Sequence, residues 1–182
     1  MERHRLLALA ITKGKVSFAN KRVLHFAPEK AVEGMIKKQR PAEYVSADLD
    51  GSKAMVSLNI ESLEVADGTY DIIFCSHVLE HVDDAKALSE LHRVLAVGGA
   101  AVLLVPLVEG WDSTYENDQF TKTPDDRATH FGQDDHIRYY GRDFRDRVKA
   151  AGFELEEFTA EGSDSAAYGL LRGEKIFLAS KI

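Results

Sequence analysis

The sequence predicts an α/β protein with a doubly wound, mostly parallel sheet, and three observations carry that prediction. Short apolar segments typical of buried strands alternate with amphipathic segments typical of helices. Residues 70–107 run in the order strand, helix, glycine pair and strand, as in a parallel β-α-β crossover. The segments 153–159 and 174–180 read as strands that could pair antiparallel at a sheet edge.

The first half of the chain predicts two helices and three strands. Pro28 is favoured in the first turn of a helix and Pro41 cannot continue one, so we expect the second helix between them. In chain order, the elements are expected at 3–12 (helix), 22–27 (strand), 28–40 (helix), 44–49 (strand) and 54–60 (strand).

The second half predicts the crossover and the closing strands. Asp83 and Asp84 suit the positive first turn of a helix, and Gly98-Gly99 suits its end. Residues 109–140 are polar, charged and aromatic, and an irregular stretch of this length is often functional. The elements are expected at 70–76 (strand), 83–96 (helix), 100–105 (strand), 141–151 (helix), 153–159 (strand) and 174–180 (strand).

Length and composition favour an ordinary globular protein. The 182 residues fit a single domain covering 1–182. A net charge of −7 argues against nucleic acid or an anionic membrane as the main partner. No apolar run reaches the roughly 18 residues of a membrane span, and the N-terminus lacks a signal-peptide pattern, so we expect a cytoplasmic protein. The single cysteine, Cys75, excludes an intramolecular disulfide and is expected in the core.

The turn after the first predicted strand is one candidate site. A strand that leads straight into a helix leaves free backbone N–H groups, which suit an anionic ligand. The turn from His25 to Glu29 has no glycine, which argues against the G-x-G-x-x-G site of NAD or FAD. It leaves room for a smaller ligand with a carboxylate, which Glu29 would repel unless the ligand also carries an ammonium group. A plain strand–helix turn is an equally good interpretation.

Polar residues also end the next two predicted strands. Asp48 lies about 20 residues past the first turn, where a carboxylate can accept both hydroxyls of a ribose. Asn59 and Ile60 follow, where an amide side chain and a backbone N–H could bind the edge of an adenine. A turn-forming role is the simpler interpretation of each polar residue taken alone.

A polar cluster of Ser76, His77, Glu80 and His81 follows the strand 70–76. Ligands bind at such strand ends in open α/β sheets. The letters also spell H-x-x-E-H, the inverted zincin signature of a metal-dependent hydrolase, but that motif needs both histidines on one helix face. Two histidines and a carboxylate remain competent metal ligands in another fold. Capping and packing are the alternative roles of Glu80 and His81.

Together these features resemble the class I S-adenosylmethionine-dependent methyltransferases, in particular the type 11 group. The resemblance is carried by the blocks YVSADLD and YDIIFCSHVLEHVDDAKALSELHRVLAVGGAAVLLVP. Within that group the chain is most similar to a bacterial subfamily with ERHRLL, LH-x-APE and FGQ-x-DH-x-R-x-YG-x-DF blocks. These stand at Glu2–Leu7, Leu24–Glu29 and Phe131–Phe144.

The resemblance implies a Rossmann-like methyltransferase fold. Its seven-stranded sheet has the order 3-2-1-4-5-7-6, with strand seven antiparallel. The cofactor is S-adenosylmethionine. His25, Ala27 and Glu29 occupy the first motif, where the family has an acidic residue and glycines around the methionine part of the cofactor.

The resemblance also assigns the later strand ends. Asp48 takes the position of the carboxylate that holds the ribose, and Asn59 and Ile60 take that of the adenine-side pair. Ser76 and His77 fall beside the methionine part and the methyl group. These roles are implied by the matching motifs and not by the spacing alone.

Methyl transfer needs a nucleophile held in line with the methyl group and shielded from water. A histidine could take the proton of a hydroxyl or amine acceptor, and His77 and His136 are the candidates. His136 lies in the long polar segment, which would cover the cofactor as a lid; its alternative role is a hydrogen-bonded strut. Some family members that methylate quinol precursors bind a divalent metal at the end of strand four. His77, Glu80 and His81 fall at comparable places, but no metal is assigned from the sequence.

We therefore expect a methyltransferase that acts on a small molecule or a protein side chain. A methyltransferase-like binding module that lost catalysis with its glycines is one alternative. A metal-dependent hydrolase built on H-x-x-E-H is another. The sequence sets no expectation for the oligomeric state.

Overall fold

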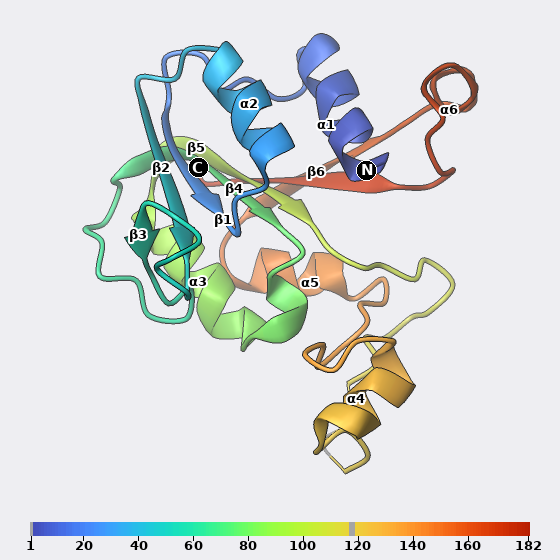
Figure 1. Cartoon of the computed structure of the whole chain (residues 1–182). Coiled ribbons are helices and arrows are strands. Elements are labelled where there is room, and N and C mark those ends of the chain that lie inside the picture. Colours follow the sequence, from blue (N-terminus) through green and yellow to red (C-terminus); the bar gives the residue numbers. More distant parts are fainter. Residues whose placement is uncertain (1, 117–118) are drawn as a thin grey trace.

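The chain folds into a seven-stranded sheet with helices on both faces (Figure 1). This computed structural model describes residues 2–116 and 119–182. The strands are β1 (Arg22–Phe26), β2 (Glu43–Asp48), β3 (Val56–Ser57), β4 (Tyr70–Ser76), β5 (Leu95–Leu104), β6 (Glu154–Thr159) and β7 (Lys175–Ser180). The helices are α1 (Glu2–Thr12), α2 (Lys30–Lys38), the 3-10 turn η1 (Leu79–His81), α3 (Asp84–Val94), α4 (Pro124–Phe131), α5 (Phe144–Ala150) and α6 (Gly162–Tyr168).

The strand order is β3-β2-β1-β4-β5-β7-β6. Strands β1 to β5 pair in parallel, whereas β7 runs antiparallel to both β5 and β6. This topology confirms the predicted doubly wound sheet, its strand order and its antiparallel strand. None of the described helices is both long and apolar enough to cross a membrane.

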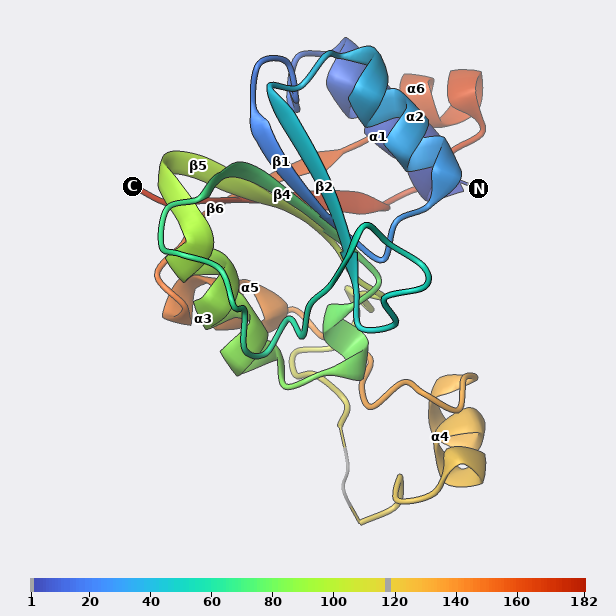
Figure 2. The ribbon, with the colours of Figure 1, turned by 60° about the vertical axis from the view of Figure 1, so that its left-hand side comes forward.

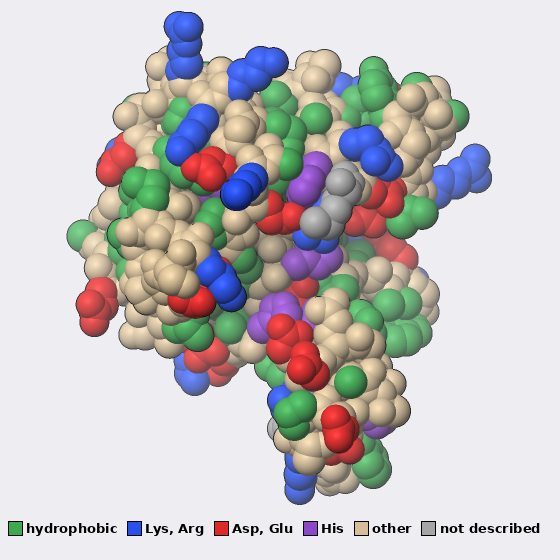
Figure 3. All heavy atoms as spheres, in the orientation of Figure 1, with side chains coloured by type: hydrophobic (Ala, Val, Ile, Leu, Met, Phe, Trp, Pro, Cys, Tyr) green, Lys and Arg blue, Asp and Glu red, His purple; other side chains and the backbone are tan. Residues whose placement is uncertain are grey.

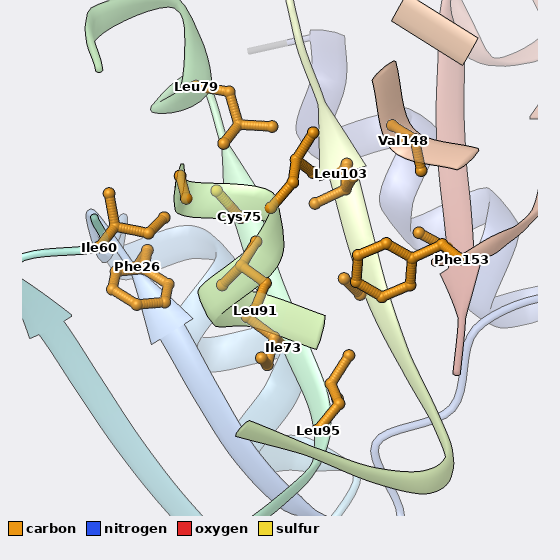
Figure 4. Close-up of a cluster of buried hydrophobic side chains, with 14 of the residues drawn as sticks. Phe26, Ile60, Ile73, Cys75, Leu79, Leu91, Leu95, Leu103, Val148 and Phe153 are labelled. Atoms are coloured by element: carbon orange, nitrogen blue, oxygen red, sulfur yellow. The ribbon is translucent and has the colours of Figure 1, made fainter. Parts of the chain in front are cut away.

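Alternating strand residues build one hydrophobic cluster on each face of the sheet, as the two-residue period of a strand requires. Leu24 and Phe26 of β1 belong to the cluster beneath α3 and α5, whereas Val23 belongs to the one beneath α1 and α2. Figure 4 shows the first cluster, with Cys75 of β4 among its members. Cys75 is fully buried, as predicted, and burial raises the pKa of its thiol.

Two predicted boundaries are wrong, one because a local turn intervenes and one because two strands approach closely. The strand expected at 54–60 is reduced to Val56–Ser57, since Asn59 accepts the backbone N–H of Glu61 and bends the chain there. Helix α3 ends at Val94, and Gly99 lies inside β5 instead of at the helix end. A Cβ at Gly99 would stand 2.8 Å from the carbonyl oxygen of Asp71, so the close approach of the strands requires a glycine.

Residues 109–140 contain a helix that the irregular-loop prediction missed. Helix α4 begins with a capping box between Thr123 and Asp126 and ends at Gly132, which has the left-handed backbone typical of a helix end. The helix lies in a lobe that projects from the body of the molecule (Figures 1 and 2). The two ends of the lobe return side by side, because Tyr115 and Tyr139 form an antiparallel bridge.

Buried charges hold the returning end of this lobe against the body. Arg138 donates to the carbonyl oxygens of Leu79 at 2.9 Å and Val82 at 2.5 Å, and to the carboxylate of Glu116 at 2.8 Å. Tyr140 donates to the same Leu79 oxygen at 3.0 Å. The guanidinium of Arg138 also lies 3.8 Å from the buried carboxylate of Asp84. This network fixes residues 138–140 on the turn η1.

Replacing the buried cation should destabilise the fold. In an Arg138→Met variant, Asp84 and the carbonyl oxygens lose a partner inside the protein, and we expect the free energy of unfolding to fall by about 3 kcal/mol. Arg142, whose ion pair with Asp112 is exposed, is the matched control. Its Arg142→Met variant should lose less than about 1 kcal/mol. Urea titration measures both, and equal losses would contradict the assigned role of Arg138.

Candidate functional site

A cavity of about 430 Å³ opens at the carboxyl ends of β1, β2 and β4. Small-molecule sites typically measure about 300–1,000 Å³. The cavity brings together Ala27, Asp48, Asn59, Ile60 and His77, all predicted from sequence as site residues. His81, a member of the polar cluster predicted at the end of the strand 70–76, also lines it. Residues that the prediction did not assign to the site complete the lining: Phe26, Leu49, Leu58, Val78, Val82 and Asp135.

The chain leaves the two central strands in a strained conformation. Ala27 directly follows β1 with a φ of 47°, and His77 directly follows β4 with a φ of 54°. A side-chain-bearing residue adopts this left-handed region at a cost of about 1–2 kcal/mol, and such strain clusters at functional sites. The chain thus has, at Ala27, a backbone conformation that glycine adopts easily, although the residue there is alanine and not the glycine of the family's first motif.

Asp48 and Asn59 combine a turn-forming role with a place in the cavity. The Oδ1 atom of Asp48 accepts the N–H of Asp50 at 2.9 Å, and that of Asn59 accepts the N–H of Glu61 at 2.9 Å. Both side chains are therefore oriented by their own turns. No described cation forms an ion pair with Asp48, so its charge is available to a ligand with hydroxyl groups.

His25 and Ser76 lie away from the cavity. Both are buried, and both alternate with strand residues of the α3 side, so they point to the face that α1 and α2 cover. His25 shares a hydrogen bond of 2.9 Å with the hydroxyl of Tyr44 and packs edge-on against Phe74. Burial lowers the pKa of His25 to about 4, which keeps the imidazole neutral.

Glu29 also lies outside the cavity, because its side chain binds residues of α1. Its carboxylate accepts hydrogen bonds from Arg3 at 3.0 Å and His4 at 2.8 Å. Partial burial raises the pKa of Glu29, but the bonds from Arg3 and His4 outweigh it and lower the pKa overall. The ERHRLL and LH-x-APE blocks therefore meet in space as a structural joint between α1 and the start of α2.

A cluster of titratable side chains lies at the end of β4. The Nδ1 atom of His77 is 3.0 Å from Oε1 of Glu80, whose carboxylate is fully buried. His77 precedes η1, so His77 and His81 are not one turn apart on an α-helix, as the zincin motif requires. Histidine side chains gather on this face of the molecule, above the lobe that carries α4 (Figure 3).

His136 reaches this cluster from the distal segment but does not line the cavity. It is 4% exposed, and its ring packs edge-on against that of His81 with the ring centres 4.6 Å apart. Burial, with a smaller contribution from His81, lowers the pKa of His136. No local pattern in the sequence indicates this pairing, because the two histidines come from segments that are far apart in the chain. His81 also contacts the backbone oxygen of Asp135, which is 54 positions away.

Comparison with known proteins gives one family and several similar folds. The family described as a methyltransferase domain matches residues 7–157. A segment of 50 residues is 40% identical to an uncharacterized protein of Methanocaldococcus jannaschii, and the match spans 28% of this chain and 22% of that protein.

Two solved structures illustrate the similarity of fold. One is a chain in the complex of the Haloferax volcanii Trm112 methyltransferase activator with a methyltransferase, at a TM-score of 0.69 and 10% identity over 98% of this chain and 89% of that chain. The other is the 1,6-didemethyltoxoflavin-N1-methyltransferase of Burkholderia thailandensis, with bound 1,6-didemethyltoxoflavin and S-adenosylhomocysteine. Its TM-score is 0.64, at 13% identity over 100% of this chain and 78% of that chain.

Stability should depend on pH through His25. Its pKa is about 4 in the folded protein and about 6.5 in the unfolded chain, so the unfolded chain binds more protons between these values. Stability is then retained above pH 6.5 and falls by about 3 kcal/mol as the pH drops to 4. Urea titrations across this range should give a shallower pH dependence for His25→Gln than for the wild type. Identical dependences would show that His25 is not the responsible group.

Relieving the strain at Ala27 should stabilise the protein. We expect Ala27→Gly to raise the free energy of unfolding by up to about 1 kcal/mol, because glycine adopts a positive φ without a steric penalty. Ala47 is the control, since it is fully buried in β2 with an extended backbone. Ala47→Gly should lower stability by about 1 kcal/mol or more. Thermal unfolding distinguishes the two, and a destabilised Ala27→Gly variant would contradict the strain.

Proposed function

The chain belongs to the methyltransferase domain family, and we propose that it transfers a methyl group from S-adenosylmethionine to a small molecule or a protein side chain. The observation that carries the proposal is the convergence of Asp48, Asn59 and His77 on one cavity at the ends of parallel strands. When bound, S-adenosylmethionine supplies an electrophilic methyl group on a sulfonium. The similar fold from Burkholderia thailandensis holds S-adenosylhomocysteine, which supports the same cofactor for this chain.

The cavity residues fit an adenosyl group by their chemistry. Asp48 offers a carboxylate without an ion-pair partner among the described residues, suited to the two hydroxyls of a ribose. Asn59 supplies an amide and Ile60 a backbone N–H for the adenine edge. Leu58 and Ile60 offer apolar surface to the flat ring, as small-molecule pockets commonly do.

His77 is the residue that we assign to the methyl acceptor. It lines the cavity, and its Nδ1 lies 3.0 Å from the buried Glu80 carboxylate. Donation of the Nδ1 proton to Glu80 leaves Nε2 to accept the proton of a hydroxyl or amine, and the carboxylate stabilises the imidazolium that forms. His136, the second sequence candidate, is buried outside the cavity lining, so we do not assign it this role.

Equilibrium binding tests the proposal. Isothermal titration with S-adenosylmethionine, S-adenosylhomocysteine and NAD should show one site for each of the first two ligands and none for NAD, since the turn after β1 lacks the dinucleotide glycines. Absence of binding by both adenosyl ligands at millimolar concentration would overturn it. Binding without transfer of a labelled methyl group to any acceptor of a broad panel would favour the non-catalytic binding module.

Removing the proposed ribose ligand should weaken the cofactor complex. We expect Asp48→Asn to raise the Kd for S-adenosylmethionine by about 10–100-fold, because a hydrogen bond to a charged group contributes about 1.5–3 kcal/mol. Asp50 is the matched control: it is exposed, lies two residues away and accepts from Ser52 instead of lining the cavity. Asp50→Asn should bind within threefold of the wild type. Unchanged binding by Asp48→Asn would show that the ribose assignment is wrong.

A further inference from the structure

Two imidazoles and a carboxylate meet beside the cavity in an arrangement that methyl transfer does not itself require. Glu80, His81 and His136 each offer one ligand atom, and these three atoms lie within 4.8 Å of one another. We propose that this cluster binds a divalent transition metal ion, and that Zn²⁺ suits its two nitrogen donors and one oxygen donor. The proposal concerns ion binding and stands whether or not the chain transfers methyl groups.

Unpartnered buried atoms provide an observation that is independent of this proximity. Glu80 is fully buried, and its Oε2 atom has no hydrogen-bond partner in the part of the chain that the structure describes. The Nδ1 atom of His136 is likewise buried without a described partner. Buried polar atoms are nearly always satisfied, and leaving one unpaired destabilises the fold. A cation beside Glu80 would give Oε2 the partner that it lacks.

His81 is already oriented as a metal ligand. Its Nδ1 atom lies 3.1 Å from the backbone oxygen of Asp135, and donation of the Nδ1 proton to that oxygen leaves the Nε2 lone pair free. The Asp135 carboxylate, 3.5 Å from the same ring nitrogen, adds negative charge near the ion. His81 is partly exposed and lines the cavity, which gives an ion a route into the cluster.

The two chain segments that supply the ligands are joined directly. The backbone N–H of Ile137 donates to the backbone carbonyl oxygen of Glu80 at 2.9 Å, next to both sets of ligands. Nitrogen and oxygen ligands of Zn²⁺ lie about 2.0–2.2 Å from the ion, so neighbouring ligand atoms come to about 3.4 Å apart. Closing the cluster from 4.8 Å therefore needs side-chain movements of about an ångström. Three protein ligands leave a fourth position for water or for an oxygen or nitrogen of another ligand.

Glu80 can serve both the ion and His77. Its Oε1 atom pairs with His77 at 3.0 Å, whereas Oε2 is the atom without a partner. An ion on Oε2 would lie next to the cavity without displacing the contact to His77. The ligand set is therefore Glu80, His81 and His136, with His77 held beside it.

Metal titration of the full chain tests the site. Protein stripped with a chelator and dialysed should bind one equivalent of Zn²⁺ in isothermal titration, and Co²⁺ should give the visible absorption of a low-symmetry site with nitrogen ligands. We expect His136→Gln and His81→Gln each to weaken Zn²⁺ binding at least tenfold. His130, an exposed histidine of α4 that bonds Tyr115, is the control. His130→Gln should bind Zn²⁺ as the wild type does.

Two results would overturn the site. One is a wild-type protein that binds no Zn²⁺ or Co²⁺ at millimolar concentration. The other is one-equivalent binding that survives in both His81→Gln and His136→Gln, which would place the ion elsewhere. Because His136 is buried, circular dichroism must show that its variant is folded; partly exposed His81 supplies the second test if it is not. Titration of S-adenosylmethionine into metal-free protein separates this result from that of the proposed function.

Discussion

The cavity depends on the reversal of strand order between β1 and β4. The chain proceeds from β1 outward to β2 and β3, and then returns to place β4 on the other side of β1. Helix α2 packs on one face of the sheet and α3 on the other, so the segments that leave β1 and β4 diverge and leave a crevice between them. Ala27 and His77, the first residues after the two strands, take the strained backbone that turns the chain away.

A second constraint holds the distal segment to this crevice. Arg138 and Tyr140 bond to the carbonyl oxygen of Leu79, which fixes the turn that carries Glu80. The same attachment brings His136 into the cluster. Hydrogen bonds from side chains that do not themselves line the cavity thus help to decide which side chains surround the end of β4. Proton acceptance by His77 and ion binding by the cluster, as we propose them, share the single buried carboxylate of Glu80.

Sequence alone determined the architecture and the part of the site that follows from it. The apolar strand 70–76 agrees with β4 residue for residue, and the resemblance supplied the observed strand order. Asp48, Asn59 and His77 could be expected together because the carboxyl ends of parallel strands meet at one edge of a sheet. The strand 54–60 and the glycine-ended helix were wrong because side-chain turns and close strand approach override a local pattern.

Only the tertiary structure decided where the remaining side chains point and what they meet. His25 and Ser76 stand next to cavity residues in sequence, yet strand alternation turns them to the opposite face. Glu29 is held by α1, and His136 meets His81 across the long distal segment. Strand alternation is a local rule, but which face of the sheet borders the cavity is decided only when the elements pack. The contacts of Glu29 and His136 join segments that are distant in the sequence, so they depend on that packing as well.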